Sequence, residues 1–330
     1  MLTRACSLLG IEHPVLLGGM ASGTSPELVA AVSNAGGLGI QGCSGQSPAQ
    51  IATLVERIRG LLTNQRFGLN LLLFRTDDTH VEAVLAAQPR VVSTAWPRAD
   101  QQLAPLFERI HGQGALAMHM VSTVHEALRA AEAGADLIVA QGTEGGGHVG
   151  VMGTFPLVRQ VVRAVAPVPV LAAGGIADGA GLAAALMLGA EGVLLGTRFL
   201  ATPEAPLPER YKQAICDSDG HDTLLTELPD VVNGQVWPGA FARVLRTSFI
   251  QEWLGREGEV RFNRAALAKR LADARANGDV PNGALLVGQD AGLIETIEPA
   301  GDVVRRIVLE AEDILRTRVP EVLPAFAPAR

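Results

Sequence analysis

Residues 168–200 read VPVLAAGGIADGAGLAAALMLGAEGVLLGTRFL. Two short apolar runs in this stretch, Val170 to Gly174 and Val193 to Gly196, lie on either side of a helical pattern. Continuous rather than alternating hydrophobicity is typical of parallel strands that are buried on both faces. The stretch therefore predicts a strand, a helix and a second, parallel strand, and each predicted strand ends in glycine.

The same strand-and-helix unit recurs over the preceding half of the chain. The helices have recognisable starts, because Ser25 and Ser47 suit the N-cap and each is followed by proline, which suits the first helical turn. Strict alternation predicts a parallel α/β sheet, and eight units close into a (β/α)₈ TIM barrel of about 250 residues. The six further predicted strands are Val15–Met20, Leu38–Gln41, Phe67–Leu73, Val91–Ala95, Ala115–Val121 and Leu137–Gln141.

The pattern changes after Gly196, which suggests three parts. Three prolines between residues 203 and 208 mark a loop, and residues 209–300 read as helical pieces without a buried-strand signal. An amphipathic segment from Asp302 to Thr317 suits the last barrel helix, and the proline-rich tail after Val319 should be loosely held. The predicted parts are the ligand-binding barrel (1–205), a smaller, mostly helical substrate or lid domain (206–300), and the final barrel helix with the tail (301–330).

Composition narrows the function classes. The formal net charge is −7 and no dense Lys/Arg block occurs, which argues against nucleic acid and favours a small-molecule partner. No segment reads as a membrane span or a signal peptide. The three cysteines have no CxxC spacing and their odd number fits a reducing cytoplasm. The sequence leaves a monomer and a homodimer equally open.

Glycines at the ends of the seventh and eighth predicted strands suit phosphate binding. Gly174 and Gly175 follow one strand, and Gly196 with Thr197 follows the other. Backbone N–H groups in such turns can approach an anion closely, and this is the usual phosphate site on this fold. The alternative is that the glycines only make tight turns. Their occurrence together, with a hydroxyl, favours the phosphate.

Residues 141–150, QGTEGGGHVG, are the most informative stretch for chemistry. Five glycines let the backbone lie against a flat ligand, at an entropic cost that a purely structural loop seldom carries. His148 at the tip could donate a hydrogen bond or exchange a proton near neutral pH, although most histidines in proteins are inert. Glu144 lies four residues before it, but the intervening glycines disfavour a helix and no third ligand occurs. We therefore predict no metal.

Two further strand ends suggest ligand contacts. Asn70 ends an apolar strand. A buried amide needs a hydrogen-bond donor and an acceptor, and the edge of a heteroaromatic ring would supply both. The alternative is that the amide bonds to local backbone. Gly18-Gly19-Met20 suits a ring lying over the backbone, and His119 near the end of the fifth strand is a weaker candidate. A Rossmann site fails on spacing, because residues 18–23 are not GxGxxG.

Together these motifs resemble those of the nitronate monooxygenase family, formerly called 2-nitropropane dioxygenases. Flavin-dependent enoyl-acyl-carrier-protein reductases and NADH:quinone reductases belong to the same superfamily. The motifs that carry the resemblance span the predicted barrel and are His13-Pro14, Gly18-Gly19-Met20, Ala31 to Gly39, Phe67 to Asn70, Gly142 to Gly150, Ala173 to Gly179 and Gly196 to Leu200.

The resemblance implies FMN as the cofactor and His148 as the catalytic residue that faces flavin and substrate. One departure is Met120, where some relatives carry a lysine suited to stabilising reduced flavin. Arg75, Asp77, Asp78 and the Trp96-Pro97-Arg98 loop are expected to shape substrate access. The predicted FMN-binding residues are Gly18, Gly19, Met20, Asn70, Gln141, Gly146, Gly147, Gly174, Gly175, Gly196, Thr197 and Gln289.

The activity implied by the resemblance is oxidation of alkyl nitronates with O₂ to carbonyl compounds and nitrite. The alternative in another reaction class is NAD(P)H-dependent reduction of enoyl thioesters or quinones. A non-enzymatic alternative is a barrel that holds FMN as a structural or sensing ligand. The response of the flavin to each reductant distinguishes the three.

Overall fold

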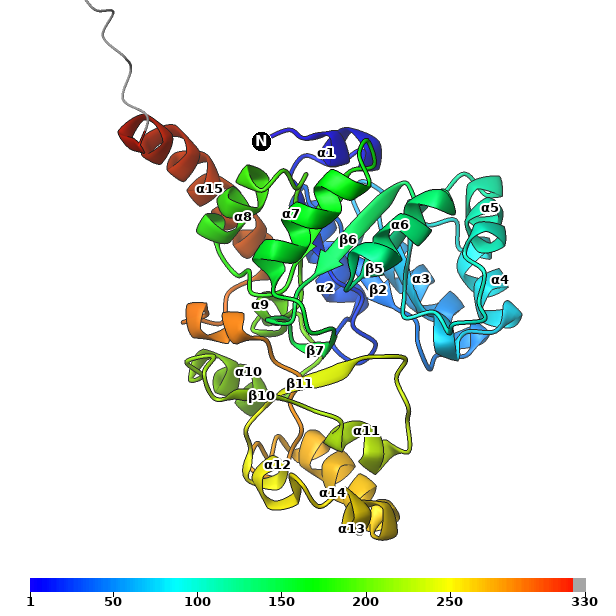
Figure 1. Cartoon of the computed structure of the whole chain (residues 1–330), viewed down its shortest axis with the longest axis vertical. Coiled ribbons are helices and arrows are strands. Elements are labelled where there is room, and N and C mark those ends of the chain that lie inside the picture. Colours follow the sequence, from blue (N-terminus) through cyan, green and yellow to red (C-terminus); the bar gives the residue numbers. More distant parts are fainter. Residues whose placement is uncertain (323–330) are drawn as a thin grey trace, which may run out of the picture.

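The computed structural model describes residues 1–322 and contains a barrel of eight parallel strands (Figure 1). The strand order is β1-β9-β8-β6-β5-β4-β3-β2. A parallel bridge between Leu16 and Leu38 joins the two ends of this order and closes the cylinder. The strands are β1 Val15–Leu17, β2 Ile40–Gly42, β3 Gly68–Leu72, β4 Val91–Ala95, β5 Leu116–Val121, β6 Leu137–Gln141, β8 Val170–Ala173 and β9 Val193–Leu195.

All eight predicted strands are confirmed, and so is the barrel. The strands β4 and β6 have the predicted bounds, whereas β1 ends at Leu17 rather than Met20. Gly18 still donates to the Leu195 carbonyl at 2.9 Å, and the following residues, Gly19 and Met20, line a cavity instead of extending the strand. The surrounding helices are α2 Pro26–Asn34, α3 Pro48–Leu61, α4 Asp78–Ala86, α5 Ala104–Gly112, α6 Val124–Glu132, α7 Thr154–Ala164, α8 Gly179–Met187 and α15 Ala300–Val322.

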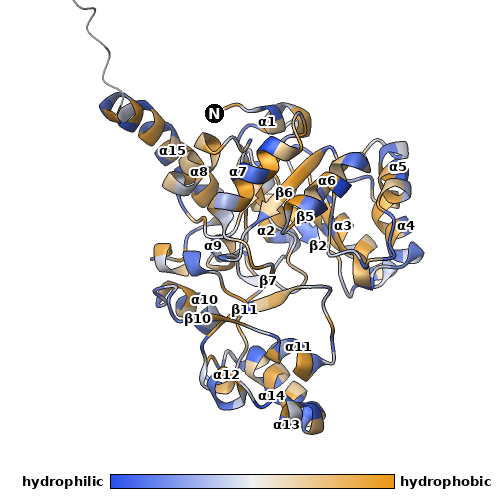
Figure 2. Cartoon of the chain, viewed as in Figure 1, coloured by the Kyte–Doolittle hydropathy of each residue, from blue (hydrophilic) through white to orange (hydrophobic). Residues whose placement is uncertain are grey.

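The interior of the barrel is a packed core, and a helix closes one end of it. The N-terminal helix α1, Arg4–Leu9, places Ala5, Cys6 and Leu9 in the same buried cluster as Leu16 and Leu171 from the strands. Figure 2 shows the hydrophobic colour of β6 at the centre of the barrel. Because this end is filled, a ligand has access only at the opposite end, where the strands finish.

The last helix packs on α8 and α2, as expected for the final helix of the barrel. A Cβ atom at Gly179 would collide with Glu310 of α15, so this contact requires glycine. The helix was expected over Asp302–Thr317 but runs from Ala300 to Val322 and includes Pro320. Residues 320–322 of the expected loose tail are therefore helical, and residues 323–330 lie outside the described part.

A smaller lobe, formed by α10 to α14 with β10 and β11, lies over the open end of the barrel (Figure 1). Residues 209–300, which read as helical pieces without a buried-strand signal, form these helices and also two strands. An antiparallel sheet of order β10-β11-β7 joins the lobe to the barrel through β7, Gly147–Val149. The lobe consists of α10 Glu209–Cys216, β10 Thr223–Thr226, α11 Leu228–Asn233, β11 Phe241–Leu245, α12 Ser248–Trp253, α13 Glu257–Phe262 and α14 Arg264–Asn277.

The two strands escaped sequence analysis for a physical reason. The strand β11 alternates apolar residues with Arg243, and its partner β7 lies far back in the chain, so neither a continuous apolar run nor a nearby hairpin turn marks it. Ala242 and Val244 are nevertheless fully buried. No helix within residues 1–322 has both the length and the apolar character needed to cross a membrane.

Candidate active site

A cavity of about 330 Å³ lies at the C-terminal ends of the barrel strands. This is the end where barrel enzymes place their chemistry, and the volume is typical of a small-molecule site. The barrel contributes Gly18, Gly19, Met20, Gln141, Gly146, Gly147, His148, Gly174, Gly196 and Thr197. The smaller lobe contributes Tyr211, Trp237 and Arg275, and the return segment, residues 288–299, which leads from the lobe to α15, contributes Asp290.

Main chain rather than side chain forms much of the barrel side of this cavity. A Cβ atom at Gly19 would collide with the side chain of Asn70, and one at Gly146 would lie 2.5 Å from the backbone N of Gly288. Neighbouring segments therefore approach so closely that only glycine fits. A flat ligand can lie directly against peptide groups at these positions.

Asn70 lies behind this wall instead of lining the cavity. Its side chain is buried, and Nδ2 donates hydrogen bonds to Ser93 Oγ at 3.1 Å and to the Ser93 carbonyl at 3.4 Å. The sequence suggested contact with a ring edge or, alternatively, a bond to local backbone. The structure shows a bond across the sheet to Ser93 of β4 and close packing of Asn70 against Gly19, and contact of the amide with a cofactor stays a prediction.

Two other predicted cofactor residues also lie outside the cavity wall. Gly175 adopts a φ of 75° and faces Glu144, not the cavity. The side chain of Gln289 is exposed, and its backbone N–H donates to the Glu144 carbonyl at 2.8 Å. The neighbour Asp290 lines the cavity, so the return segment does reach the site, one residue later than expected.

Gln141 supplies a test of whether a flavin fits this cavity. Its side-chain Oε1 is buried and has no hydrogen-bond partner in the described part of the chain. A buried acceptor without a donor costs about 1–3 kcal/mol, so a ligand that brings a donor would be favoured. The flavin ring carries one imide N–H of this kind. Together with the glycine-lined wall, this orphaned acceptor fits the cofactor that the sequence implies.

His148 lies on the rim of the cavity, in the middle of β7 rather than at the tip of a loop. Its Nε2 donates to Asp230 of α11, at 2.9 Å from Oδ1 and 3.0 Å from Oδ2. Both side chains are largely buried, with exposures of 12% and 9%. The carboxylate therefore orients the ring and leaves Nδ1 as the nitrogen available to a substrate.

Aromatic side chains enclose His148. The ring of Trp237 stacks on the imidazole with centroids 3.3 Å apart and an angle of 10°, and Trp96 meets Trp237 edge-on at 6.2 Å. The backbone of Trp96 has a φ of 54°, a left-handed conformation that costs on the order of 1–3 kcal/mol in a non-glycine residue. Such strain is often found where a side chain must be held in a binding site.

The phosphate end predicted from the sequence forms one continuous wall. Gly174, with a φ of 92°, and Gly196 lie beside Thr197, whose Oγ1 accepts a hydrogen bond from the Gly288 backbone N–H at 3.0 Å. The return segment thus closes directly over the ends of β8 and β9. Asp290 adds a buried carboxyl group to the same wall.

Several residues of the site were not identified from the sequence. Asp230, Trp237, Tyr211 and Arg275 come from the smaller lobe, which showed no chemical signature. Among them only Trp237 could have been noticed in the sequence, because the chain contains just three tryptophans. Of the residues expected to shape substrate access, Arg75 and Trp96 line the cavity. Asp77 instead caps α4, and Asp78 forms an ion pair with Arg109.

His119, the weaker candidate, does not reach the cavity. It is 1% exposed, its Nδ1 lies 2.7 Å from Thr94 Oγ1, and its ring packs against Phe107 of α5. Burial lowers the pKa of His119 to about 4, so this side chain is neutral at physiological pH. It belongs to the packing between the sheet and its helices.

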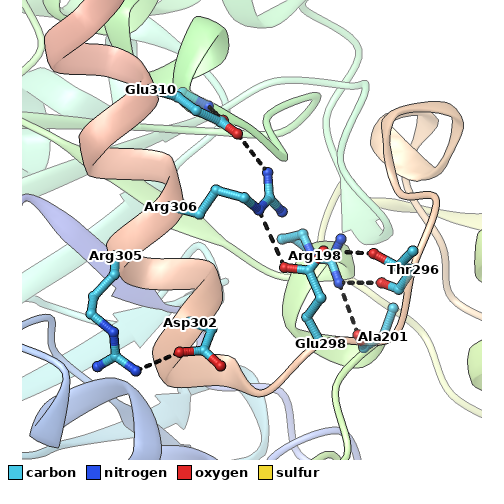
Figure 3. Close-up of polar contacts among 9 residues, drawn as sticks. Arg198, Ala201, Thr296, Glu298, Asp302, Arg305, Arg306 and Glu310 are labelled. Atoms are coloured by element: carbon cyan, nitrogen blue, oxygen red, sulfur yellow. Dashed lines mark hydrogen bonds and ion pairs between the residues drawn. The ribbon is translucent and has the colours of Figure 1, made fainter.

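An arginine holds the segment that returns to α15 after lining the cavity. Arg198, buried in α9 (Thr197–Leu200), donates through Nη2 to the carbonyls of Ala201 at 2.9 Å and Thr296 at 2.8 Å (Figure 3). On α15, Arg306 contacts Glu298 and Glu310. These bonds tie the return segment to both the barrel loop and the last helix, which fixes the position of Asp290.

Residues 1–322 contain no group of three or more His, Cys, Asp or Glu side chains that could hold a metal ion. The family model for nitronate monooxygenase matches residues 3–79 and 75–310 of the chain.

Similar proteins cover the whole length. The (3aS,4S,5R,7aS)-5-hydroxy-7a-methyl-1-oxo-octahydro-1H-indene-4-carboxyl-CoA dehydrogenase of Mycobacterium tuberculosis is 34% identical over 96% of this chain and 97% of its own. The structure of FabK from Thermotoga maritima is 36% identical, with a TM-score of 0.87 and coverage of 97% and 99%. A nitroalkane oxidase from Streptomyces ansochromogenes is 29% identical, with a TM-score of 0.81 and coverage of 96% and 99%.

Proposed function

The chain belongs to the nitronate monooxygenase family of flavin-dependent oxidoreductases, and from this premise we propose that it binds FMN and oxidises alkyl nitronates with O₂ to carbonyl compounds and nitrite. The observation that carries the proposal is the hydrogen-bonded pair of His148 and Asp230 on the rim of a glycine-walled cavity. The pair places an orienting carboxylate behind an imidazole, which in turn faces the space for a substrate.

The barrel side of the cavity would hold the cofactor. The backbone at Gly18, Gly19 and Met20 would support the ring, with Gly146 and Gly147 against it, and Gln141 would accept from its imide N–H. The turns at Gly174, Gly196 and Thr197 would hold the phosphate. When bound, FMN supplies the capacity to accept electrons from the substrate and to react with O₂.

The His148–Asp230 pair would bind and orient the substrate. In its protonated form, His148 would donate from Nδ1 to the negative oxygens of a nitronate while Nε2 stays bonded to Asp230. For a neutral nitroalkane, Nδ1 of the unprotonated ring would remove the α-proton, and Asp230 would stabilise the resulting charge. Trp96 and Trp237 exclude water on this side and favour a small alkyl group.

A second candidate function is oxidation or reduction of a thioester, with NAD(P)H as reductant in the second case. Arg75 and Arg275 line the cavity, and neither forms an ion pair with a carboxylate within residues 1–322. Arg275 donates from Nη2 to the Ser22 carbonyl at 2.7 Å and has further N–H groups. Guanidinium groups without a carboxylate partner suit the phosphates of a phosphorylated carrier or nucleotide. The similarity to a CoA dehydrogenase over nearly the whole chain favours the same class.

Anaerobic stopped-flow mixing distinguishes the two. Purified protein is mixed with propyl-2-nitronate, NADH or NADPH while the flavin absorbance is followed. We expect rapid bleaching by the nitronate and near inertness to both nucleotides. Rapid bleaching by a nucleotide alone would support the reductase form of the second candidate, and a flavin that none of the three reduces would overturn both the nitronate reaction and that form.

A further inference from the structure

Asp290 is a buried acid in the wall where a phosphate is expected. It is 5% exposed, lines the cavity, and belongs to the short 3₁₀ helix η2, Gln289–Leu293. Within residues 1–322 it forms no ion pair with a lysine, arginine or histidine. Its side chain folds back over its own segment, where a Cβ atom at Gly288 would collide with Oδ1. The position therefore offers a carboxyl group to the cavity without a neutralising partner.

The charged groups around Asp290 do not compensate for its burial. Arg198 of α9 is the nearest cation, but its Nη2 is bonded to two carbonyls. Glu144, which contacts the segment through its backbone, directs its carboxylate to Thr154. Asp219, before β10, accepts from backbone N–H groups, and Cys216 of α10 lies nearer Arg198. Burial accordingly raises the pKa of Asp290 to about 7.

The hydrogen bonds of Thr197 connect this acid to the phosphate site. Thr197 Oγ1 accepts from the Gly288 N–H at 3.0 Å, and its hydroxyl lies close enough to Asp290 to stabilise the ionised carboxylate. A hydroxyl has one donor, so while it is turned to the carboxylate it has none for a phosphate. If Asp290 is protonated, its own O–H can donate, and the Thr197 hydroxyl is released toward the cavity.

We propose that Asp290 takes up one proton when the phosphate of FMN binds beside Thr197. This inference rests on the proposed FMN binding and states that the uptake of one proton accompanies it. Two negative charges in one buried wall cannot both persist, because each is desolvated and they repel. Protonation removes the repulsion and restores the Thr197 donor. The protein thus recognises a phosphate through a neutral acid, and its affinity for FMN falls as the pH rises above neutral.

Isothermal titration calorimetry tests this with the full chain freed of flavin. FMN is titrated at pH 8.0 in two buffers of different ionisation enthalpy, and riboflavin, which lacks the phosphate, serves as the matched ligand. The second phosphate pKa is about 6, so FMN itself contributes little proton uptake at this pH. We expect an uptake of about 0.9 proton for FMN and none for riboflavin, and about eightfold weaker FMN binding at pH 8.5 than at pH 7.5.

The D290N variant identifies the group. It keeps a neutral donor in place, so we expect FMN binding without proton uptake and with little change between pH 7.5 and 8.5. Uptake that persists in D290N, or uptake of the same size for riboflavin, would overturn the inference. If D290N does not fold, judged by circular dichroism, the wild-type comparison of FMN with riboflavin still decides. Failure of folded wild-type protein to bind FMN at any pH would refute the proposed cofactor itself.

Discussion

The barrel side and the lobe side of the cavity are built in different ways. The barrel side presents main chain from the glycine turns after β1, β8 and β9, whereas the lobe side presents the large side chains Trp237, Tyr211 and Arg275. Peptide groups recognise a flat ring and a phosphate, which stay constant among enzymes that use one cofactor. Side chains can vary one at a time and so determine substrate. The contrast separates the proposed cofactor wall from a proposed substrate wall, which consists of these lobe side chains and of His148 in β7, the strand that pairs with β11 of the lobe.

The largest effect should come from removing the imidazole of the substrate wall. In H148N we expect kcat/KM for propyl-2-nitronate to fall by on the order of 10³, because the acid-base and anion-binding group is lost. FMN content, measured from absorbance, should stay unchanged. His111, exposed on α5 and paired with Asp136, provides the matched control H111N, which should keep full activity. Loss of FMN from H148N would place His148 in the cofactor wall instead.

Asp230 should act through His148 as a positioning residue. In D230N the new amide can donate to Nε2 and so favour the other tautomer, with the proton on Nδ1. We expect kcat to fall by on the order of 10² with a shifted pH profile, since the imidazolium loses its carboxylate. The conservative variant D230E should recover part of the activity. An unchanged pH profile with reduced activity would indicate a purely structural role.

His119, which packs between the sheet and the helix α5, provides a stability prediction that involves neither wall. Its folded-state pKa of about 4 lies below the unfolded value near 6.5, so the unfolded chain binds the extra proton first as the pH falls. Stability should decline as the pH drops below 6.5, by about 2 kcal/mol between pH 7.5 and pH 5. Thermal unfolding of H119Q should show a smaller drop over this range. An equal drop in both proteins would assign the acid sensitivity to other groups.

The smallest effect should be confined to the phosphate. In T197V, which keeps the shape of the side chain, we expect FMN to bind about tenfold more weakly at pH 6.5 because one hydrogen bond is lost. Riboflavin affinity should not change, and fluorescence quenching measures both ligands. Equal weakening of the two would mean that Thr197 supports the ring region, so the phosphate would lie elsewhere.

The cofactor wall was largely predictable and the substrate wall was not. Gly18, Gly19, Gly174, Gly196 and Thr197 directly follow apolar runs, so their position on the barrel is set by a few neighbouring residues. Asn70, Gly175 and Gln289 came from the same motifs but lie behind or beside the wall. Which way a residue next to a turn points depends on backbone torsions that the sequence pattern does not contain.

The sequence by itself determined the barrel, its open end and the glycine turns, because strand hydrophobicity, helix caps and glycine punctuation are local signals. Only the tertiary structure decided that Asp230 holds His148, 82 residues away, and that Asp290 lines the same cavity as Thr197. Both depend on the pairing of β7 with β11 and on the return of the chain past Arg198. Such contacts arise from the packing of distant segments, for which no local pattern exists.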